Sequence, residues 1–131
     1  MNSENTKKIL EKYPELTANS KLSMSESCMY WLFEFGDGWY DLMDKLCEDI
    51  MKLDVDKICR FDQTKEKFAQ LRIYWHLIDE DKHNIYDKIY ELIDKAEDES
   101  ANICESCGNP GKITGGYWLK TLCENCLKKE N

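Results

Sequence analysis

The sequence predicts an α+β protein in which a small antiparallel sheet packs with two long helices, followed by a C-terminal four-cysteine zinc ribbon or truncated treble clef. Three patterns predict this class: apolar residues at helical spacing over 39–53, strict alternation over 71–77, and two Cys-x-x-Cys pairs near the end. A chain of 131 residues has the size of one domain. We expect an N-terminal helix and loop over 1–27, an acidic α+β body over 28–103, and a zinc-finger module over 104–131 that packs on the body as one unit.

Two amphipathic segments predict the long helices. The first has apolar residues at intervals of three and four, namely Trp39, Leu42, Met43, Leu46, Ile50 and Leu53. The second follows Asp79, Glu80 and Asp81, which are acids suited to a helix N-terminus, and runs to about residue 101. Its apolar stripe comprises Ile85, Ile89, Leu92, Ile93 and Ala96. A shorter helix over 3–13 is expected to begin at an N-cap, Ser3, and to end before Pro14.

Residues 57–77 predict a β-hairpin. Its second strand is indicated by Leu71, Ile73, Trp75 and Leu77, which alternate with polar or amphipathic residues in the period of two of a half-buried strand. Residues 58–61 are the expected partner strand, joined to it through a charged turn at 64–67. The aromatic run over 28–35 favours another short strand, with one helical turn as the alternative.

The chain has a formal net charge of -8, and the negative charge is unevenly distributed along it. The residues from Cys104 onward sum to +1, so the body carries -9. An acidic body repels phosphate backbones, so we expect no direct nucleic-acid binding, whereas a basic protein surface would suit it. Acidic residues that only keep the protein soluble are the alternative interpretation. The N-terminus lacks the apolar core of a secretory signal, and no uncharged run exceeds seven residues, so we expect a cytoplasmic protein without membrane contact.

The two Cys-x-x-Cys pairs are the strongest chemical signal. Cys104 and Cys107 form one pair, and Cys123 and Cys126 form the other, with fifteen residues between the pairs. Each pair can place two thiolates on one side of a tight turn, and two such turns complete a tetrahedron around Zn²⁺. All four positions are cysteine, so no ligand position is left for a catalytic water. We therefore expect one structural zinc ion per chain.

The remaining sequence motifs do not indicate a catalytic site. The chain has no nucleophile-elbow, P-loop or dinucleotide-binding motif. Its two histidines, His76 and His83, lie outside both cysteine pairs, and the segment between Cys107 and Cys123 has no histidine, aspartate or glutamate, which excludes a His-Asn-His nuclease finger. We expect no enzymatic activity. The one locally basic patch, a candidate partner-binding site, comprises Lys65, Lys67 and Arg72 with Trp75; an ordinary charged hairpin turn is the alternative.

Several motifs together resemble a family of small zinc-finger proteins of phages, prophages and bacterial genomes. They are Gly36-Asp37-Gly38-Trp39, Lys65-Glu66-Lys67-Phe68, Leu71-Arg72-Ile73-Tyr74, the helix end Lys95-Ala96-Glu97, the knuckle Cys104-Glu105-Ser106-Cys107-Gly108-Asn109-Pro110-Gly111, and Trp118-Leu119-Lys120-Thr121-Leu122-Cys123. The resemblance covers about residues 33–126. It implies a small phage-type zinc protein, and zinc-binding anti-CRISPR proteins are one group to which such a chain could belong. Members often have histidine near the last ligand, where this chain has Cys126.

Two functional hypotheses follow. The first is a non-catalytic, zinc-stabilised protein-binding module of phage type that inhibits a nucleic-acid-guided (CRISPR) defence nuclease in the host cytoplasm. Three observations support it: the phage-type resemblance, the acidic body and the lack of catalytic motifs. The second is a zinc-ribbon adaptor or regulator that contacts nucleic acid through the finger and the patch of Lys65, Lys67 and Arg72.

Overall fold

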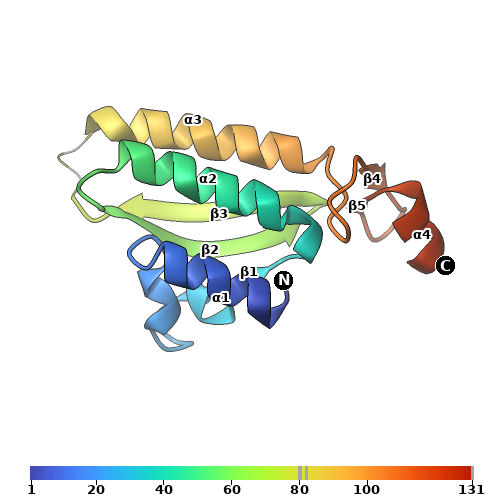
Figure 1. Cartoon of the computed structure of the whole chain (residues 1–131), viewed down its shortest axis with the longest axis horizontal. Coiled ribbons are helices and arrows are strands. Elements are labelled where there is room, and N and C mark those ends of the chain that lie inside the picture. Colours follow the sequence, from blue (N-terminus) through green and yellow to red (C-terminus); the bar gives the residue numbers. More distant parts are fainter. Residues whose placement is uncertain (80, 82, 131) are drawn as a thin grey trace.

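The computed structural model describes residues 1–79, 81 and 83–130, and its α+β architecture confirms the predicted fold class (Figure 1). Over these residues the four α-helices are α1 (Ser3–Lys12), α2 (Tyr40–Leu53), α3 (His83–Ser100) and α4 (Glu124–Glu130). The main sheet contains β1 (Phe33–Glu34), β2 (Cys59–Lys67) and β3 (Gln70–Leu77), and a second sheet pairs β4 (Lys112–Thr114) with β5 (Lys120–Leu122). The described residues also form three short 3-10 helices, η1 (Ala18–Lys21), η2 (Cys28–Trp31) and η3 (Asp37–Trp39).

The body is layered around the three-stranded sheet. Helices α2 and α3 lie side by side over one face, α1 lies on the other side of the sheet, and the segment with β4, β5 and α4 sits at one end of the body (Figure 1). The core between sheet and helices is apolar and includes Phe61, Leu71, Met43, Ile50 and Ile89, each fully buried. Burial of these side chains provides the main driving force for folding of the body.

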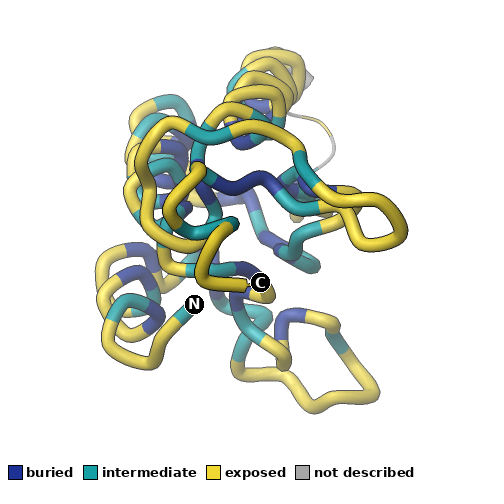
Figure 2. The backbone as a smooth tube through the Cα atoms, turned by 90° about the vertical axis from the view of Figure 1, so that its right-hand side faces the viewer, coloured by how far each residue is buried: buried dark blue, intermediate teal, exposed yellow. Residues whose placement is uncertain are grey.

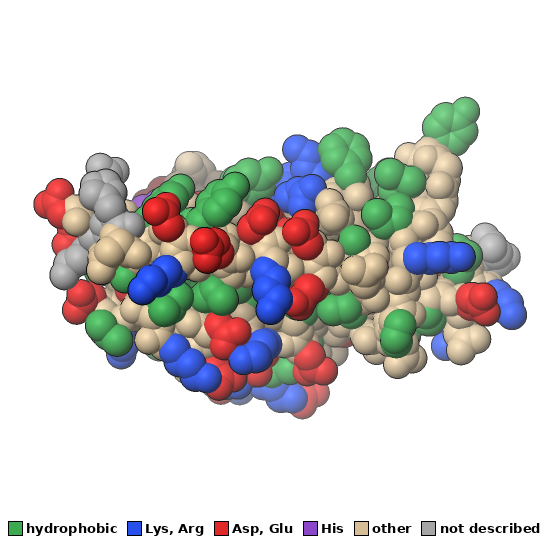
Figure 3. Space-filling model, turned by 90° about the horizontal axis from the view of Figure 1, so that it is seen from above, with side chains coloured by type: hydrophobic (Ala, Val, Ile, Leu, Met, Phe, Trp, Pro, Cys, Tyr) green, Lys and Arg blue, Asp and Glu red, His purple; other side chains and the backbone are tan. Residues whose placement is uncertain are grey.

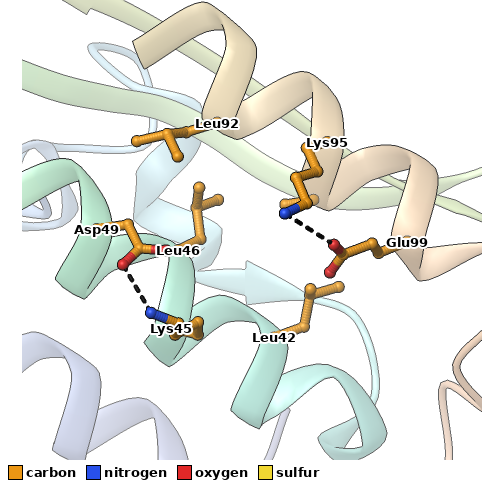
Figure 4. A pocket seen from close by; sticks show the side chains of 8 residues that line it. Leu42, Lys45, Leu46, Asp49, Leu92, Lys95 and Glu99 are labelled. Carbon is orange, nitrogen blue, oxygen red and sulfur yellow. Dashed lines mark hydrogen bonds and ion pairs between the residues drawn. The ribbon is translucent and has the colours of Figure 1, made fainter. Parts of the chain in front are cut away.

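Helices α2 and α3 meet along an apolar seam. Leu42 and Leu46 of α2 face Leu92 of α3 across a shallow hollow of about 140 Å³ (Figure 4). Ion pairs within each helix flank it, Lys45–Asp49 at 2.8 Å and Lys95–Glu99 at 3.8 Å. Both predicted long helices are thus present close to their expected bounds, although Glu80, in the predicted acidic start of the second one, lies outside the described residues.

The hairpin differs from the prediction in the position of its turn. Strand β2 continues through the expected turn at 64–67 as far as Lys67, and the chain reverses at Phe68 and Ala69. The reason is that β1 pairs with β2 at Thr64 and Lys65, so a turn there would break two ladders at once. The pairing of β1 is parallel, which makes the sheet mixed instead of purely antiparallel.

Of two further local predictions, the one for residues 28–35 is met by both of its alternatives in succession, and the one for the cap of α1 is corrected. Residues 28–35 form η2 followed by the two-residue β1, because the Ser27 side chain accepts the N–H of Met29 at 3.1 Å and starts a helical turn. Helix α1 is capped by Asn2, whose side-chain oxygen accepts the N–H of Asn5 at 2.8 Å, and not by Ser3. Within the described residues, no helix has the length and apolar character needed to cross a membrane.

Candidate metal centre

The four predicted ligands converge. The Sγ atoms of Cys104, Cys107, Cys123 and Cys126 all lie within 4.8 Å of one another, and the Cys107 and Cys123 sulfurs are 3.6 Å apart. Four sulfurs at about 2.3 Å from a tetrahedral zinc ion would be about 3.8 Å apart. A disulfide needs about 2.05 Å, and all seven cysteines are free thiols. The donor set therefore fits a metal ion, and its all-sulfur composition favours one structural zinc.

The local folds around the two pairs explain this convergence. The Gly108 N–H donates to the Cys104 carbonyl at 2.9 Å, and Gly108 has a φ of 84°, so glycine lets the first knuckle close. Strands β4 and β5 then return the chain, and Cys126 lies in the first turn of α4. The order knuckle, hairpin and ligand-bearing helix selects the truncated treble clef over the zinc ribbon.

The surroundings of the sulfurs shift the pKa values of two of the four thiols in opposite directions. Burial opposes ionisation of Cys104, but backbone N–H groups of Cys123, Cys107 and Ser106 bring the pKa of its thiol down to about 7. Hydrogen bonds with the Cys123 and Cys107 sulfurs raise the pKa of Cys126 to about 12. Four thiolates so close together cannot all ionise without a compensating positive charge, which a bound divalent metal would supply.

The first knuckle is docked on the body where α2 begins. The Gly38 N–H donates to the Glu105 carbonyl oxygen at 2.7 Å, and the Gly36 N–H donates to Glu105 Oε2 at 2.9 Å. The Trp39 indole N–H donates to the Ile103 carbonyl at 2.8 Å, and its side chain is fully buried. Burial raises the pKa of Glu105, and the Gly36 N–H opposes that effect.

The two glycines are needed for this close approach. A Cβ on Gly38 would lie 2.0 Å from the Cys104 carbonyl oxygen, and one on Gly36 would lie 2.5 Å from the Glu105 carbonyl oxygen. Sequence reasoning identifies this segment only as a turn before a helix. The pattern Gly-x-Gly-Trp is the available signal, but nothing local shows that its partner is the first cysteine pair.

A second contact joins the finger to the sheet. The Thr121 hydroxyl, fully buried in β5, donates to the Ala69 carbonyl in the β2–β3 turn at 2.7 Å. The finger is therefore attached to two parts of the body, the start of α2 and the end of the hairpin. A metal ion bound at the cysteines would therefore stabilise both contacts as well as the finger.

The predicted partner-binding residues do not form one cluster. Lys65 and Arg72 are register partners across the hairpin, and Lys67 shares their face two residues further along β2. Trp75 lies on the other face of β3 with the buried Ile73, and its ring is 4.7 Å from that of Tyr86 in α3. Lys65, Lys67 and Arg72 can act together, whereas Trp75 belongs to the helix side of the sheet.

The remaining cysteines and His76 have other surroundings. Cys47 and Cys59 are buried in the core, and burial raises the pKa of both thiols, that of Cys59 to about 12. Cys28 is exposed in η2. His76 Nδ1 is 2.9 Å from an Asp62 carboxylate oxygen on the sheet. Among the described residues, the four cysteines are the one group of potential ligands that could hold a metal ion.

Comparison with models of protein families, with curated proteins and with solved structures finds no match for this chain. The fold and the site therefore define a class, an α+β protein with a candidate four-cysteine metal centre at one end. Of the phage-type resemblance, the part that the structure supports is the cysteine cluster.

Proposed function

We propose that this protein is a non-catalytic, zinc-stabilised protein-binding module that uses the outer face of α3 to bind a basic protein surface. One observation carries this proposal. Four carboxylates form a continuous exposed row along the helix, at spacings of four, three and four residues: Asp87, Glu91, Asp94 and Asp98. We call this row the acidic stripe.

The carboxylates of the acidic stripe differ from those of α1 and α2 in their ion pairs. In α1 and α2, lysines one turn away or on the neighbouring helix pair with Glu4, Glu11, Asp44, Glu48 and Asp49. Over the described part of the chain, no ion pair includes a member of the acidic stripe. Its negative charge is therefore available to a partner, and Figure 3, which looks onto α2 and α3, shows acidic side chains on this surface.

The acidic stripe also has features of an interface beyond charge. Tyr86 and Tyr90 stand exposed on the same helix, and Tyr86 is supported by its ring contact with Trp75. Exposed tyrosines held by packing give contact area at little entropic cost. The helix is anchored at its other end, where Glu97 Oε2 accepts the N–H of Ile73 at 2.9 Å and the Ser100 hydroxyl accepts the N–H of Leu71 at 2.8 Å.

In its specific form, the proposal assigns the partner to the class of nucleic-acid-guided defence nucleases, which the protein would inhibit. A nuclease of this type holds guide and target in a positively charged channel. An exposed row of carboxylates is complementary to such a channel and would compete with the phosphate backbone. The phage-type resemblance of the sequence supports the same assignment.

The test measures binding to, and inhibition of, a panel of guide-loaded CRISPR nucleases by the zinc-loaded full chain. The variant D87N/E91Q/D94N/D98N removes the acidic stripe. A matched control removes the same number of charges elsewhere, at Glu4, Glu11, Glu34 and Glu48, each replaced by glutamine. We expect the stripe variant to bind about tenfold or more weakly than the control.

Two outcomes would contradict the proposal. If no nuclease of the panel is bound or inhibited at micromolar concentration, the assignment to this class of partner is wrong. If the stripe variant and the matched control bind equally well, the acidic stripe is not the contact surface. Thermal melts of both variants establish that each remains folded.

A further inference from the structure

A second exposed surface lies where the body meets the finger. It consists of Phe68 from the β2–β3 turn, Tyr117, Trp118 and Leu119 from the β4–β5 loop, and Lys67 beside them, and we call it the tip surface. Phe68 is 72% exposed, Trp118 is 76% exposed and Tyr117 is fully exposed. Figure 3 shows hydrophobic side chains beside lysine or arginine at this end of the body, with another projecting from the finger. Three exposed aromatic rings on neighbouring loops are unusual for a surface without a ligand.

The β2–β3 turn holds Phe68 outward in an unfavourable backbone conformation. Phe68 has a φ of 52° and Ala69 a φ of 71°, the two positive angles that a two-residue type I′ turn requires. Asn-Gly or Asp-Gly normally occupies such a turn, because phenylalanine and alanine are disfavoured at positive φ. A bulky exposed residue kept at a strained position indicates a role for its side chain outside the fold.

The β4–β5 loop carries the rings of Tyr117 and Trp118, and its backbone conformation is fixed by a glycine and a hydrogen bond. Gly115 has a φ of 97°, and a Cβ there would lie 2.3 Å from the Trp118 carbonyl oxygen, so the loop closes only with glycine. The Thr114 hydroxyl donates to the Lys120 carbonyl at 3.2 Å and ties the two ends of the loop together. The buried bond from Thr121 to Ala69 then holds this hairpin against the β2–β3 turn.

Between the two loops lies an open hollow of about 250 Å³, lined by Glu66, Phe68, Tyr117, Trp118 and Leu119. It is bounded mainly by rings. The Glu66 carboxylate in it already accepts the Ala69 N–H at 2.7 Å. A flat aromatic group could stack there against Phe68 or Trp118.

Positive charge lies directly beside the rings. Lys67 Nζ is 5.7 Å from the centre of the Phe68 ring, a cation–π contact. Lys65 and Arg72 follow on the same face of the hairpin as Lys67. The Debye length is about 8 Å at roughly 0.15 M ionic strength, so a ligand at the tip responds to these cations and to the Glu66 carboxylate in the hollow, and it is screened from carboxylates further along α2 and α3.

We infer that the tip surface binds single-stranded nucleic acid. Its bases would stack on Phe68, Trp118 and Tyr117, and its phosphates would lie against Lys67, Lys65 and Arg72. In a single strand, planar bases alternate with negatively charged phosphates. The exposed rings can stack on the bases, and the neighbouring cations can bind the phosphates. A protein partner is the competing occupant, since protein interfaces are also rich in aromatic side chains, and the test distinguishes the two.

This inference goes beyond the proposed function and does not depend on it. The inference departs from the expectation that the protein does not bind nucleic acid directly. That expectation rests on the acidic body and on the few lysines of the finger, whereas the tip surface adds Lys65, Lys67 and Arg72 of the hairpin to the rings of the finger, as in the second functional hypothesis. The two proposals are compatible, because a guided nuclease carries single-stranded nucleic acid next to its basic surfaces. They fail separately, because the assay for the tip surface contains no nuclease.

The test is fluorescence anisotropy of labelled oligouridine and oligothymidine of about ten nucleotides with the zinc-loaded full chain at roughly 100 mM salt. We expect saturable binding of the single strands and weaker binding of a duplex of the same length. Trp118→Ala and Phe68→Asn should each weaken binding about fivefold or more, and Lys67→Gln should reduce the salt dependence. Asparagine tolerates positive φ, so Phe68→Asn keeps the turn.

The matched control is Trp31→Ala, which removes another exposed tryptophan, 56% exposed and located in η2. Its binding should equal that of the wild type. Lack of binding by the wild type, equal binding by Trp118→Ala and Phe68→Asn, or equal affinity for duplex and single strand would each overturn the inference.

Discussion

The backbone N–H of Gly38 donates to the carbonyl oxygen of Glu105 at 2.7 Å, and this bond joins the start of α2 to the first cysteine knuckle. The neighbouring bond from the Trp39 indole to the Ile103 carbonyl strengthens the junction. The candidate metal centre is thus part of the same structure as the hydrophobic core. Four measurements test this relationship and its surroundings.

Gly38→Ala should destabilise the protein by about 2 to 3 kcal/mol and weaken zinc retention, because the added Cβ would lie 2.0 Å from the Cys104 carbonyl oxygen. Gly116→Ala is the matched control, since a Cβ there meets nothing within 4 Å. Urea denaturation and a chelator competition assay measure the two effects. Equal behaviour of the two variants would show that the knuckle does not depend on this approach.

Cys107→Ser should abolish stoichiometric zinc binding, because a four-sulfur site that loses one thiolate loses both a ligand and the charge that holds the cation. Cys28→Ser, which changes an exposed cysteine outside the cluster, should retain one zinc ion per chain. Elemental analysis of the two purified proteins gives the answer. A wild-type protein without zinc, or a Cys107→Ser variant with it, would contradict the assignment.

Removal of the metal with a strong chelator should lower the stability of the whole chain and not only of the finger. The reason is that the finger shares buried hydrogen bonds with both α2 and the hairpin, so the parts are expected to unfold together. Far-UV circular dichroism and tryptophan fluorescence should therefore report one melting transition with zinc, shifted to lower temperature without it. Two separate transitions in the zinc-loaded protein would show an independent finger.

Glu97→Gln should change how stability depends on pH. Burial raises the pKa of Glu97 above its ordinary value of 4.5, although the Ile73 N–H opposes this effect. The folded state then binds the proton more tightly than the unfolded chain, so the free energy of unfolding falls as the pH rises from that ordinary value through the raised one. Glutamine can still accept the Ile73 N–H but does not ionise. The variant should therefore gain stability relative to the wild type over this interval, as measured by urea denaturation at matched pH values.

The parts of the fold that the sequence predicts well are those with local patterns. The sequence predicts α2 from residue 39, and the helix runs over Tyr40–Leu53, since its apolar stripe is set by a period that neighbouring residues reveal. All four clustered cysteines are predicted as ligands, because the spacing inside each Cys-x-x-Cys pair determines the geometry of its turn.

The parts that the sequence does not predict depend on partners distant in sequence. Charged residues at 64–67 resemble a turn, but the parallel pairing with β1 keeps that segment extended. Phe68 is not expected in the turn, because its positive φ contradicts its intrinsic preference. The docking of Glu105 on Gly36 and Gly38 has no periodic signal at all, since it joins two irregular loops.

The bond between the Gly36 N–H and the Glu105 carboxylate joins positions 69 residues apart, so it can form only after both segments have been synthesised. The segment that begins α2 leaves the ribosome well before the knuckle that it contacts. Closing a loop of this length is slow compared with forming a helix. A metal ion could therefore bind all four cysteines only after the segment that begins α2, and with it the body that the knuckle contacts, has left the ribosome.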